Sequence, residues 1–125
     1  MNKSYLTINK ISAYNKSFDF SNEVWNKVVC WDYFAKDTVG KQFVRSADSV
    51  SANIAEGFGR FSKKDKTRFY RIGVGSLEET GDWIRKSSVR NLISTKQEQE
   101  LLYNLEEIRK EIFHLINFTN EKLKY

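Results

Sequence analysis

The chain has 125 residues, 40% of them hydrophobic, and a formal net charge of +5. This length predicts one domain with a real apolar core and is too short for two. The single cysteine excludes an internal disulfide, and no apolar run approaches the roughly 18 residues of a membrane-spanning helix. Because the N-terminus also lacks a signal-peptide pattern, we expect a cytoplasmic protein with no membrane contact.

Residues 1–17 mix apolar side chains with Asn, Lys and Ser, and no clean period emerges. A short strand, a disordered arm and a segment that packs on a neighbouring subunit are the alternatives. We predict a poorly ordered or interface-dependent arm, which leaves residues 18–125 as the folded domain.

The first predicted helix covers residues 21–36. Its apolar side chains recur at spacings of four, three and four, with two aromatic residues widening the stripe: Val24, Val28, Trp31 and Ala35, then Trp25 and Phe34. Cys30 lies in this apolar stretch without a neighbouring His, so we expect an inert buried thiol.

Asp37 or Thr38 is the expected cap of a second helix that continues to residue 56. Its apolar seam again follows the helical repeat and consists of Phe43, Ala47, Val50 and Ile54. The polar row Ser46, Ser49 and Asn53 lies beside that seam. Hydrogen bonding between subunits and plain solvent exposure are equally compatible with this row.

A glycine-rich turn follows, and we name residues 57–62 the elbow. Gly57 and Gly59 predict the end of the second helix, because glycine accepts the left-handed backbone of a C-cap. Ser62 predicts the N-cap of a third helix over residues 63–90, with Asp65 favouring its positive end. Phe69 is expected in the core stripe of this helix, with Tyr70 on its flank.

Small residues interrupt the third helix and lower its helical propensity. Gly73, Gly75 and Gly81 therefore predict a close approach of another helix. Gly75 and Gly81 lie off the centre of the stripe, which favours an approach by another subunit. The third helix is thus expected to contact more than its own chain.

Ser94 and Gln97 form the pattern of a capping box and predict the start of the fourth helix. Apolar residues then recur with heptad-like spacing towards the C-terminus: Leu101, Leu105, Ile108, Ile112 and Leu115. Four helices with short connections predict an all-α, antiparallel up-down-up-down four-helix bundle.

Several stretches around the elbow resemble a known family. They are SVSANIAEGFGR at residues 49–60, Lys63-Lys64, Arg68-Phe69 and GSLEE at residues 75–79. The family is called four-helix bundle or S23 ribosomal proteins. Its members are encoded by intervening sequences inside 23S rRNA genes. The family includes the accessory variability determinant of diversity-generating retroelements. The resemblance implies a four-helix bundle with a basic surface, often a homopentamer, and no known enzyme activity. Ser51 departs from this pattern, because the family commonly has proline there.

Positive charge concentrates around the elbow. Residues 41–90 carry eleven Lys and Arg against six Asp and Glu, whereas the rest of the chain is balanced at ten against ten. A local field of this sign attracts polyanions such as RNA or DNA. The candidate nucleic-acid-binding residues are Arg45, Arg60, Lys63, Lys64, Lys66, Arg68, Arg71, Arg85, Lys86 and Arg90.

A solvated helix face explains the same charges equally well. Glu78, Glu79 and Asp82 lie between the two basic ends of the third helix, and Asp82 with Lys86 is a favourable pair. Phe58 and Phe61 at the elbow are candidates for stacking on unpaired bases, whereas core or interface packing is expected of Phe69 and Tyr70.

Other chemistry is thinly represented. Glu111 and His114 match one Glu-x-x-His element of di-iron bundles, but the complete site needs two elements and the chain has one His. The glycines lack the remaining features of a phosphate loop. We therefore expect no cofactor, no metal site and no enzyme activity.

The function expected from the sequence is non-catalytic binding of structured RNA, or of an RNA–protein complex, by a homo-oligomer acting through the elbow. The alternative is an oligomeric scaffold that recruits a protein partner such as a polymerase. An enzyme or metalloprotein is the remaining alternative and has the least support.

Overall fold

The computed structural model describes residues 7–125, and these form four long helices with short connections. A 3-10 turn, η1 (Ile8–Lys10), leads into α1 (Ser12–Val28). The expected arm therefore extends too far, because residues 12–17 are the first turns of α1. The part of that prediction that falls on residues 1–6 lies outside the described residues.

Buried serines interrupt the apolar pattern at the start of α1, so periodicity does not predict these first turns. Ser17 and Ser21 lie on the core face, where the pattern requires apolar side chains. The Ser17 hydroxyl donates to the carbonyl of Ala13 at 2.7 Å, and that of Ser21 donates to the carbonyl of Phe18 at 2.9 Å. Such bonds satisfy a buried hydroxyl within its own helix, so a polar residue can occupy a core position.

The second helical segment begins earlier than predicted. Asp32, and neither Asp37 nor Thr38, caps it by accepting a hydrogen bond from the Ala35 backbone at 3.1 Å. From there α2 (Tyr33–Ala35), a π-helical turn η2 (Lys36–Gly40) and α3 (Lys41–Phe58) follow one another without a loop. The first predicted helix consequently ends at Val28, and Phe34 is 76% exposed instead of widening a core stripe.

Both predicted N-caps of the last two helices are confirmed. Ser62 caps α4 (Lys63–Val89), and Ser94 forms a capping box with Gln97 at the start of α5 (Thr95–Lys122). The predicted end of the third helix at residue 90 is correct to within one residue, and Asn91, where no glycine stands, adopts a left-handed φ of 59° there. Its neighbour Leu92 donates to the carbonyl of Ser87 at 2.8 Å, the bond typical of a Schellman motif.

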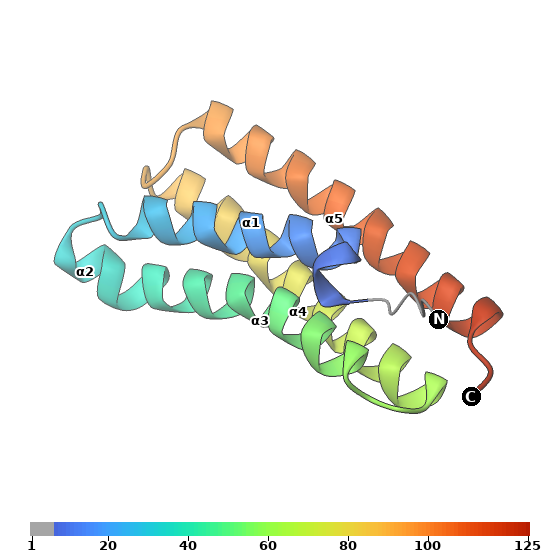
Figure 1. Cartoon of the computed structure of the whole chain (residues 1–125). Helices are drawn as coiled ribbons and strands as arrows, with labels where there is room; N and C mark the ends of the chain where they lie inside the picture. Colours follow the sequence, from blue (N-terminus) through green and yellow to red (C-terminus); the bar gives the residue numbers. More distant parts are fainter. Residues whose placement is uncertain (1–6) are drawn as a thin grey trace.

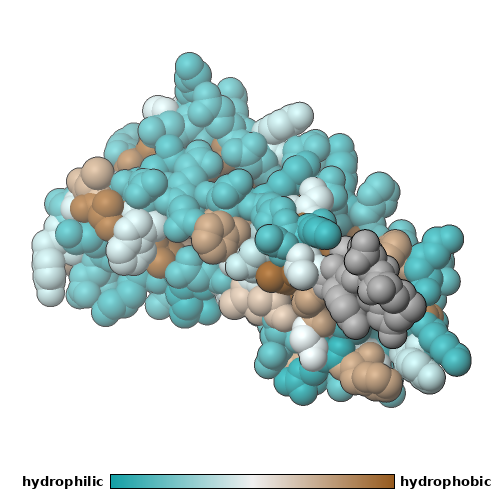
Figure 2. Space-filling view, viewed as in Figure 1, coloured by the Kyte–Doolittle hydropathy of each residue, from teal (hydrophilic) through white to brown (hydrophobic). Residues whose placement is uncertain are grey.

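The four long helices run up, down, up and down, as predicted (Figure 1). The start of α1, the elbow and the C-terminus lie at one end of the bundle, and the α1–α2 and α4–α5 connections lie at the other. Apolar side chains from all four helices form one core. Hydrophilic residues cover most of the face seen in Figure 2, with apolar surface in separate spots.

Helices α3 and α4 approach each other closely through small residues. A β-carbon on Gly73 would lie 3.5 Å from the Val50 carbonyl oxygen, which confirms the expected close approach there. The hydroxyls of Ser49 and Ser76 lie 2.9 Å apart. The polar row on α3 therefore joins two helices of one chain, an arrangement that neither interpretation of the row anticipated.

The other two glycines of α4 differ from Gly73. Gly81 is buried, and a β-carbon there would lie 3.5 Å from Leu105 of α5, so its small size already serves packing within the chain. Gly75 has nothing within 4 Å of such a β-carbon among the described residues. None of the helices in residues 7–125 combines the length and apolar character needed to cross a bilayer.

Candidate nucleic-acid interface

The elbow is held by the C-terminal segment of the chain. The Lys63 backbone N–H, the first of α4, donates to the main-chain oxygen of Tyr125 at 2.7 Å. The Lys63 ammonium donates to the carbonyl of Asn120 at 3.1 Å, and the rings of Phe61 and Tyr125 stack with their centroids 5.4 Å apart. Because these contacts are long-range, the sequence offered no signal that residues 120–125 belong to this region.

The two glycines of the elbow act differently from the prediction. Gly57 lies inside α3, and Gly59 is the C-cap with a right-handed φ of −78°. Within the described residues no glycine has a positive φ. The turn therefore does not depend on a left-handed glycine, and Gly57 is needed for packing space instead.

Arg60 and Arg68 lie against the same aromatic ring. Their guanidinium carbons lie 4.6 and 4.5 Å from the centroid of Phe69, close enough for cation–π attraction. Arg60 also pairs with Glu56 at 3.1 Å. Phe69 is thus half-buried beneath two cations, whereas Tyr70, expected on the flank, is fully buried.

Lys66 extends inward from the first turn of α4. Its ammonium donates to the carbonyl of Phe58 at 2.7 Å and lies 5.5 Å from the centroid of the Phe58 ring. Burial lowers the pKa of this lysine from its ordinary value. The ammonium therefore stabilises the end of α3 from within the elbow, where it has lost part of its hydration.

Lys64 and Arg71 are exposed on the outer surface of α4. Across residues 7–125, no carboxylate oxygen lies within 4.0 Å of either cation. Their spacing of seven residues places them on the same side of the helix, two turns apart. These two charges remain available to an external anion.

The remaining candidates lie farther away. With 27 residues, α4 is about 40 Å long, so Arg85, Lys86 and Arg90 lie towards the opposite end of the bundle from the elbow. Lys86 pairs with Asp82 at 2.7 Å, and Arg45 of α3 pairs with Glu79. The structure therefore separates the predicted residues into an elbow group and a distant group, with acidic residues between them.

An apolar hollow of about 360 Å³ opens beside the elbow, and we name it the elbow pocket. Its walls come from α3, the elbow, α4, the C-terminal part of α5, the three residues after α5 and the residue before α1. They are Ile11, Phe58, Arg60, Phe61, Lys66, Tyr70, Leu115, Phe118, Thr119, Leu123, Lys124 and Tyr125. None of these side chains is acidic. The pocket thus combines aromatic walls with positive charge.

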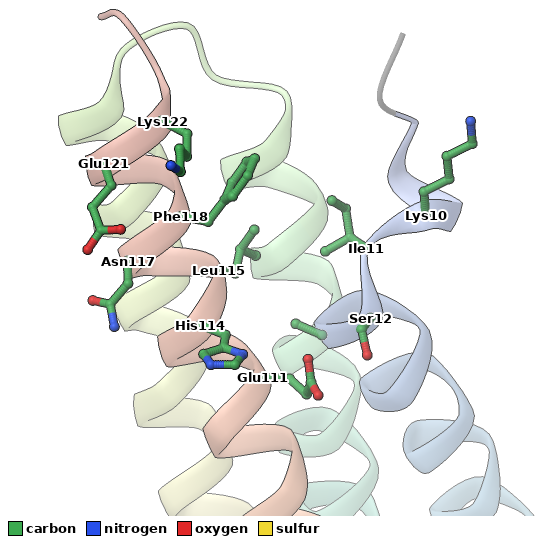
Figure 3. Close-up of a pocket in the computed structure, with 11 residues that line it drawn as sticks. Lys10, Ile11, Ser12, Glu111, His114, Leu115, Asn117, Phe118, Glu121 and Lys122 are labelled. Atoms are coloured by element: carbon green, nitrogen blue, oxygen red, sulfur yellow. The ribbon is translucent and has the colours of Figure 1, made fainter. Parts of the chain in front are cut away.

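A second hollow, of about 580 Å³, lies between the start of α1 and the end of α5 (Figure 3). Ile11 faces Leu115 and Phe118 across it, and its rim carries both signs of charge, including Lys10, Glu111, Glu121 and Lys122. His114 is exposed here, and Glu111 pairs with Lys16 at 3.5 Å.

Two further expectations concern a metal site and the cysteine. Within the described part of the chain, no three His, Cys, Asp or Glu side chains gather closely enough to hold a metal ion. Cys30, expected to be buried, is exposed because α1 ends at Val28 and the thiol lies in the connection that follows.

The sequence model of a known protein family, the 23S rRNA-intervening sequence protein, matches residues 9–114 of this chain. The chain belongs to this family. A crystal structure of a protein of unknown function from the S23 ribosomal protein family of Bacteroides thetaiotaomicron VPI-5482 has the same fold, with a TM-score of 0.74. That protein is 24% identical, and the match covers 83% of this chain and 97% of the neighbour. No curated protein matches this chain. The family resemblance seen in the sequence is therefore confirmed, and the structural likeness concerns the fold alone.

Proposed function

We propose that this intervening-sequence protein is a non-catalytic RNA-binding protein whose binding surface is the elbow end of the bundle. The observation that carries the proposal is the exposure of Lys64 and Arg71 on one side of α4 without a carboxylate partner. Unpaired cations on a rigid helix can neutralise RNA phosphates and release condensed counterions. Recognition would follow backbone charge and shape, without readout of base sequence by these two residues.

The surroundings of these two residues strengthen the local positive field. Lys63 and Lys66 donate to main-chain carbonyls, which carry no net charge, while Asp65 partly offsets Arg68 at 3.7 Å. The C-terminal segment adds Lys122 and Lys124 to the same end of the bundle. Because the elbow is tied down by α5, this charge is held in place and loses little conformational entropy on binding.

The absence of catalysis is part of this proposal and rests on the small inventory of reactive groups. The chain has one His and one Cys. His114 and Cys30 are both exposed, on α5 and in the α1–α2 connection. Within residues 7–125 neither is paired with a base or a nucleophile in the way that covalent catalysis requires; the Cys30 thiol donates to the main-chain carbonyl of Asn26.

The proposal is tested by titrating nuclease-treated protein into a labelled ribosomal RNA stem-loop across a series of salt concentrations. We expect Lys64→Glu with Arg71→Glu to weaken binding at every salt concentration and to reduce the slope of log affinity against log salt by about 2, one unit per phosphate contact. Both side chains are exposed and make no ion pair, so the double variant should unfold like the native protein.

Lys36→Glu with Lys96→Glu is the matched control, since it makes the same charge change at exposed positions away from the elbow. This control should leave the salt slope nearly unchanged, because distant charges are screened beyond about 10 Å. Equal weakening by the two double variants would show that only net charge matters. That result, or no binding by the native protein at low salt, would overturn the proposal.

A scaffold role is the second candidate, supported by an apolar stripe along α1 and its C-cap residue. Phe18, Trp25 and Val29 are 48%, 54% and 42% exposed, and their spacing places them on one side of the helix. We propose that this stripe contacts a second copy of the chain or another protein. Light scattering should give a mass several times 14.7 kDa that falls when Trp25 is changed to Ser. A native monomer would contradict self-association.

A further inference from the structure

We propose that the elbow pocket binds a single unpaired base of an RNA strand whose phosphates lie on the surrounding cations. The inference rests on the RNA-binding function proposed above and adds a recognition element to it. Lys64 and Arg71 would attract the backbone, and the pocket would distinguish single-stranded or looped RNA from a regular duplex, whose bases are stacked inside.

The mouth of the pocket carries two exposed aromatic rings. Phe61 and Tyr125 are 79% and 61% exposed, and their rings stack at an angle of 25°. An aromatic pair held in place and open to solvent offers a flat surface on which a base can continue the stack. Every base has such a face, so stacking of this kind tolerates different sequences.

The interior of the pocket is apolar and rigid. Its floor is formed by Tyr70 and Thr119, which are 1% and 2% exposed and belong to the core of the bundle. A volume of about 360 Å³ is at the lower end of the range of about 300–1,000 Å³ for small-molecule sites. The pocket is therefore suited to one planar group rather than to a long segment of a partner.

Charge complementarity selects an anionic ligand. Arg60, Lys66 and Lys124 line the pocket, and no Asp or Glu lines it. Arg60 also pairs with Glu56, which lies outside the lining, whereas Lys66 contacts the carbonyl and the ring of Phe58 and forms no ion pair within residues 7–125. The neighbouring hollow of Figure 3 provides an internal comparison, because Glu111 and Glu121 there balance its lysines.

A planar aromatic ring joined to a phosphate matches this arrangement of rings and cations. An acyl chain with a carboxylate head also has a negative charge and a body that an apolar pocket accepts, but it gains nothing from the stacked rings. Phe61 and Tyr125 therefore favour a nucleotide, and the experiment includes the acyl chain as a competing outcome.

The test compares two fluorescein-labelled RNA probes of the same length, a dodecauridylate and its abasic counterpart, which keeps the phosphates and lacks the bases. Fluorescence anisotropy with the full chain should show about tenfold or tighter binding of the uridylate, as expected for one stacked base. Phe61→Ala and Tyr125→Ala should each remove most of that difference and leave the abasic affinity unchanged.

Phe34→Ala is the matched control, since Phe34 is 76% exposed and belongs to α2 at the other end of the bundle. It should leave both affinities unchanged. All three substitutions remove exposed rings, so circular dichroism should show native helix content for each.

The pocket assignment would be overturned if the native protein bound the uridylate and the abasic probe with equal affinity. It would also be overturned if Phe61→Ala and Phe34→Ala lost the same amount of affinity for the uridylate. If the Lys64 and Arg71 variants still weaken binding in that case, the proposed function stands and only this inference fails. If the native protein binds neither probe at low salt, both fail. Saturable binding of decanoate that requires Phe61, without base-dependent RNA binding, would replace the nucleotide by an acyl chain.

Discussion

Gly57 of α3 lies directly against Tyr70 of α4. A β-carbon on Gly57 would come within 2.7 Å of Cε1 of Tyr70 and within 2.8 Å of the Lys66 carbonyl oxygen. Non-bonded carbon atoms normally stay about 3.5 Å or more apart, so no other residue fits here without movement of the backbone. This contact sets the distance between α3 and α4 beside the elbow pocket, of which Tyr70 forms the floor.

We expect Gly57→Ala to lower the free energy of unfolding by about 1–2 kcal/mol. Overpacking at a well-packed contact costs about 1–3 kcal/mol, and the better helical propensity of alanine returns up to about 1 kcal/mol. Urea unfolding followed by circular dichroism measures the change. Unchanged stability would show that α4 moves aside freely.

Gly75→Ala should have the opposite effect. Because nothing among the described residues lies within 4 Å of a β-carbon at this position, the substitution adds helical propensity without a clash. We expect a gain of about 1 kcal/mol in the free energy of unfolding. A loss, accompanied by a lower mass in light scattering, would instead reveal a close contact with a second copy of the chain at Gly75.

Ser87→Ala should stabilise the protein. Ser87 is fully buried, and its hydroxyl oxygen has no hydrogen-bond partner among residues 7–125. Removal of an unsatisfied buried hydroxyl and the better propensity of alanine together favour the folded state by about 1 kcal/mol. Ser46→Ala is the control, since that buried hydroxyl lies 3.0 Å from the hydroxyl of Thr80. Urea unfolding should separate the two, and equal effects would contradict the explanation.

Asn91→Gly should also stabilise the protein, by a few tenths of a kcal/mol to about 1 kcal/mol, whereas Asn91→Ala should destabilise it. The left-handed φ of 59° suits glycine, is tolerated by asparagine and strains alanine. Thermal unfolding of the two variants and of the native protein measures this order of stability. Equal melting temperatures for Gly and Ala would show that the backbone changes conformation on substitution.

The buried phenol of Tyr70 should make stability fall at high pH. Burial raises the pKa of Tyr70 from 10.0 to about 12, and the Thr119 hydroxyl opposes this shift. Between these values the unfolded chain has lost the phenolic proton and the folded chain keeps it. The contribution to stability is therefore complete below pH 10 and is lost as the pH rises through 12.

Comparison with Tyr70→Phe isolates this effect, because the variant cannot titrate at that position. From pH 9 to pH 11.5 the native protein should lose about 2 kcal/mol more of its free energy of unfolding than the variant does. Tyr103→Phe, at a 66% exposed position, should behave like the native protein. Parallel pH profiles for native protein and Tyr70→Phe would show that the phenolate is accommodated in the folded state.

Local signals in the sequence predicted the helices well where the signal and its effect lie close together. Ser62 and Ser94 cap the helices that follow them, because a hydroxyl and the N–H it accepts from are three residues apart. The same reasoning failed for Trp25, which was expected to widen the core stripe and is 54% exposed. Periodicity identifies an apolar face, but the neighbouring helices determine how much of that face is covered.

Local patterns predicted four amphipathic helices and an excess of positive charge around the elbow, since spacing, caps and charge are properties of neighbouring residues. The pairing of those charges depends on the folded structure, because the partners Glu79 of Arg45 and Asn120 of Lys63 lie far along the chain. The fold also brought Tyr125 onto Phe61 and so created the elbow pocket. Long-range packing, which no local pattern encodes, places the two rings together.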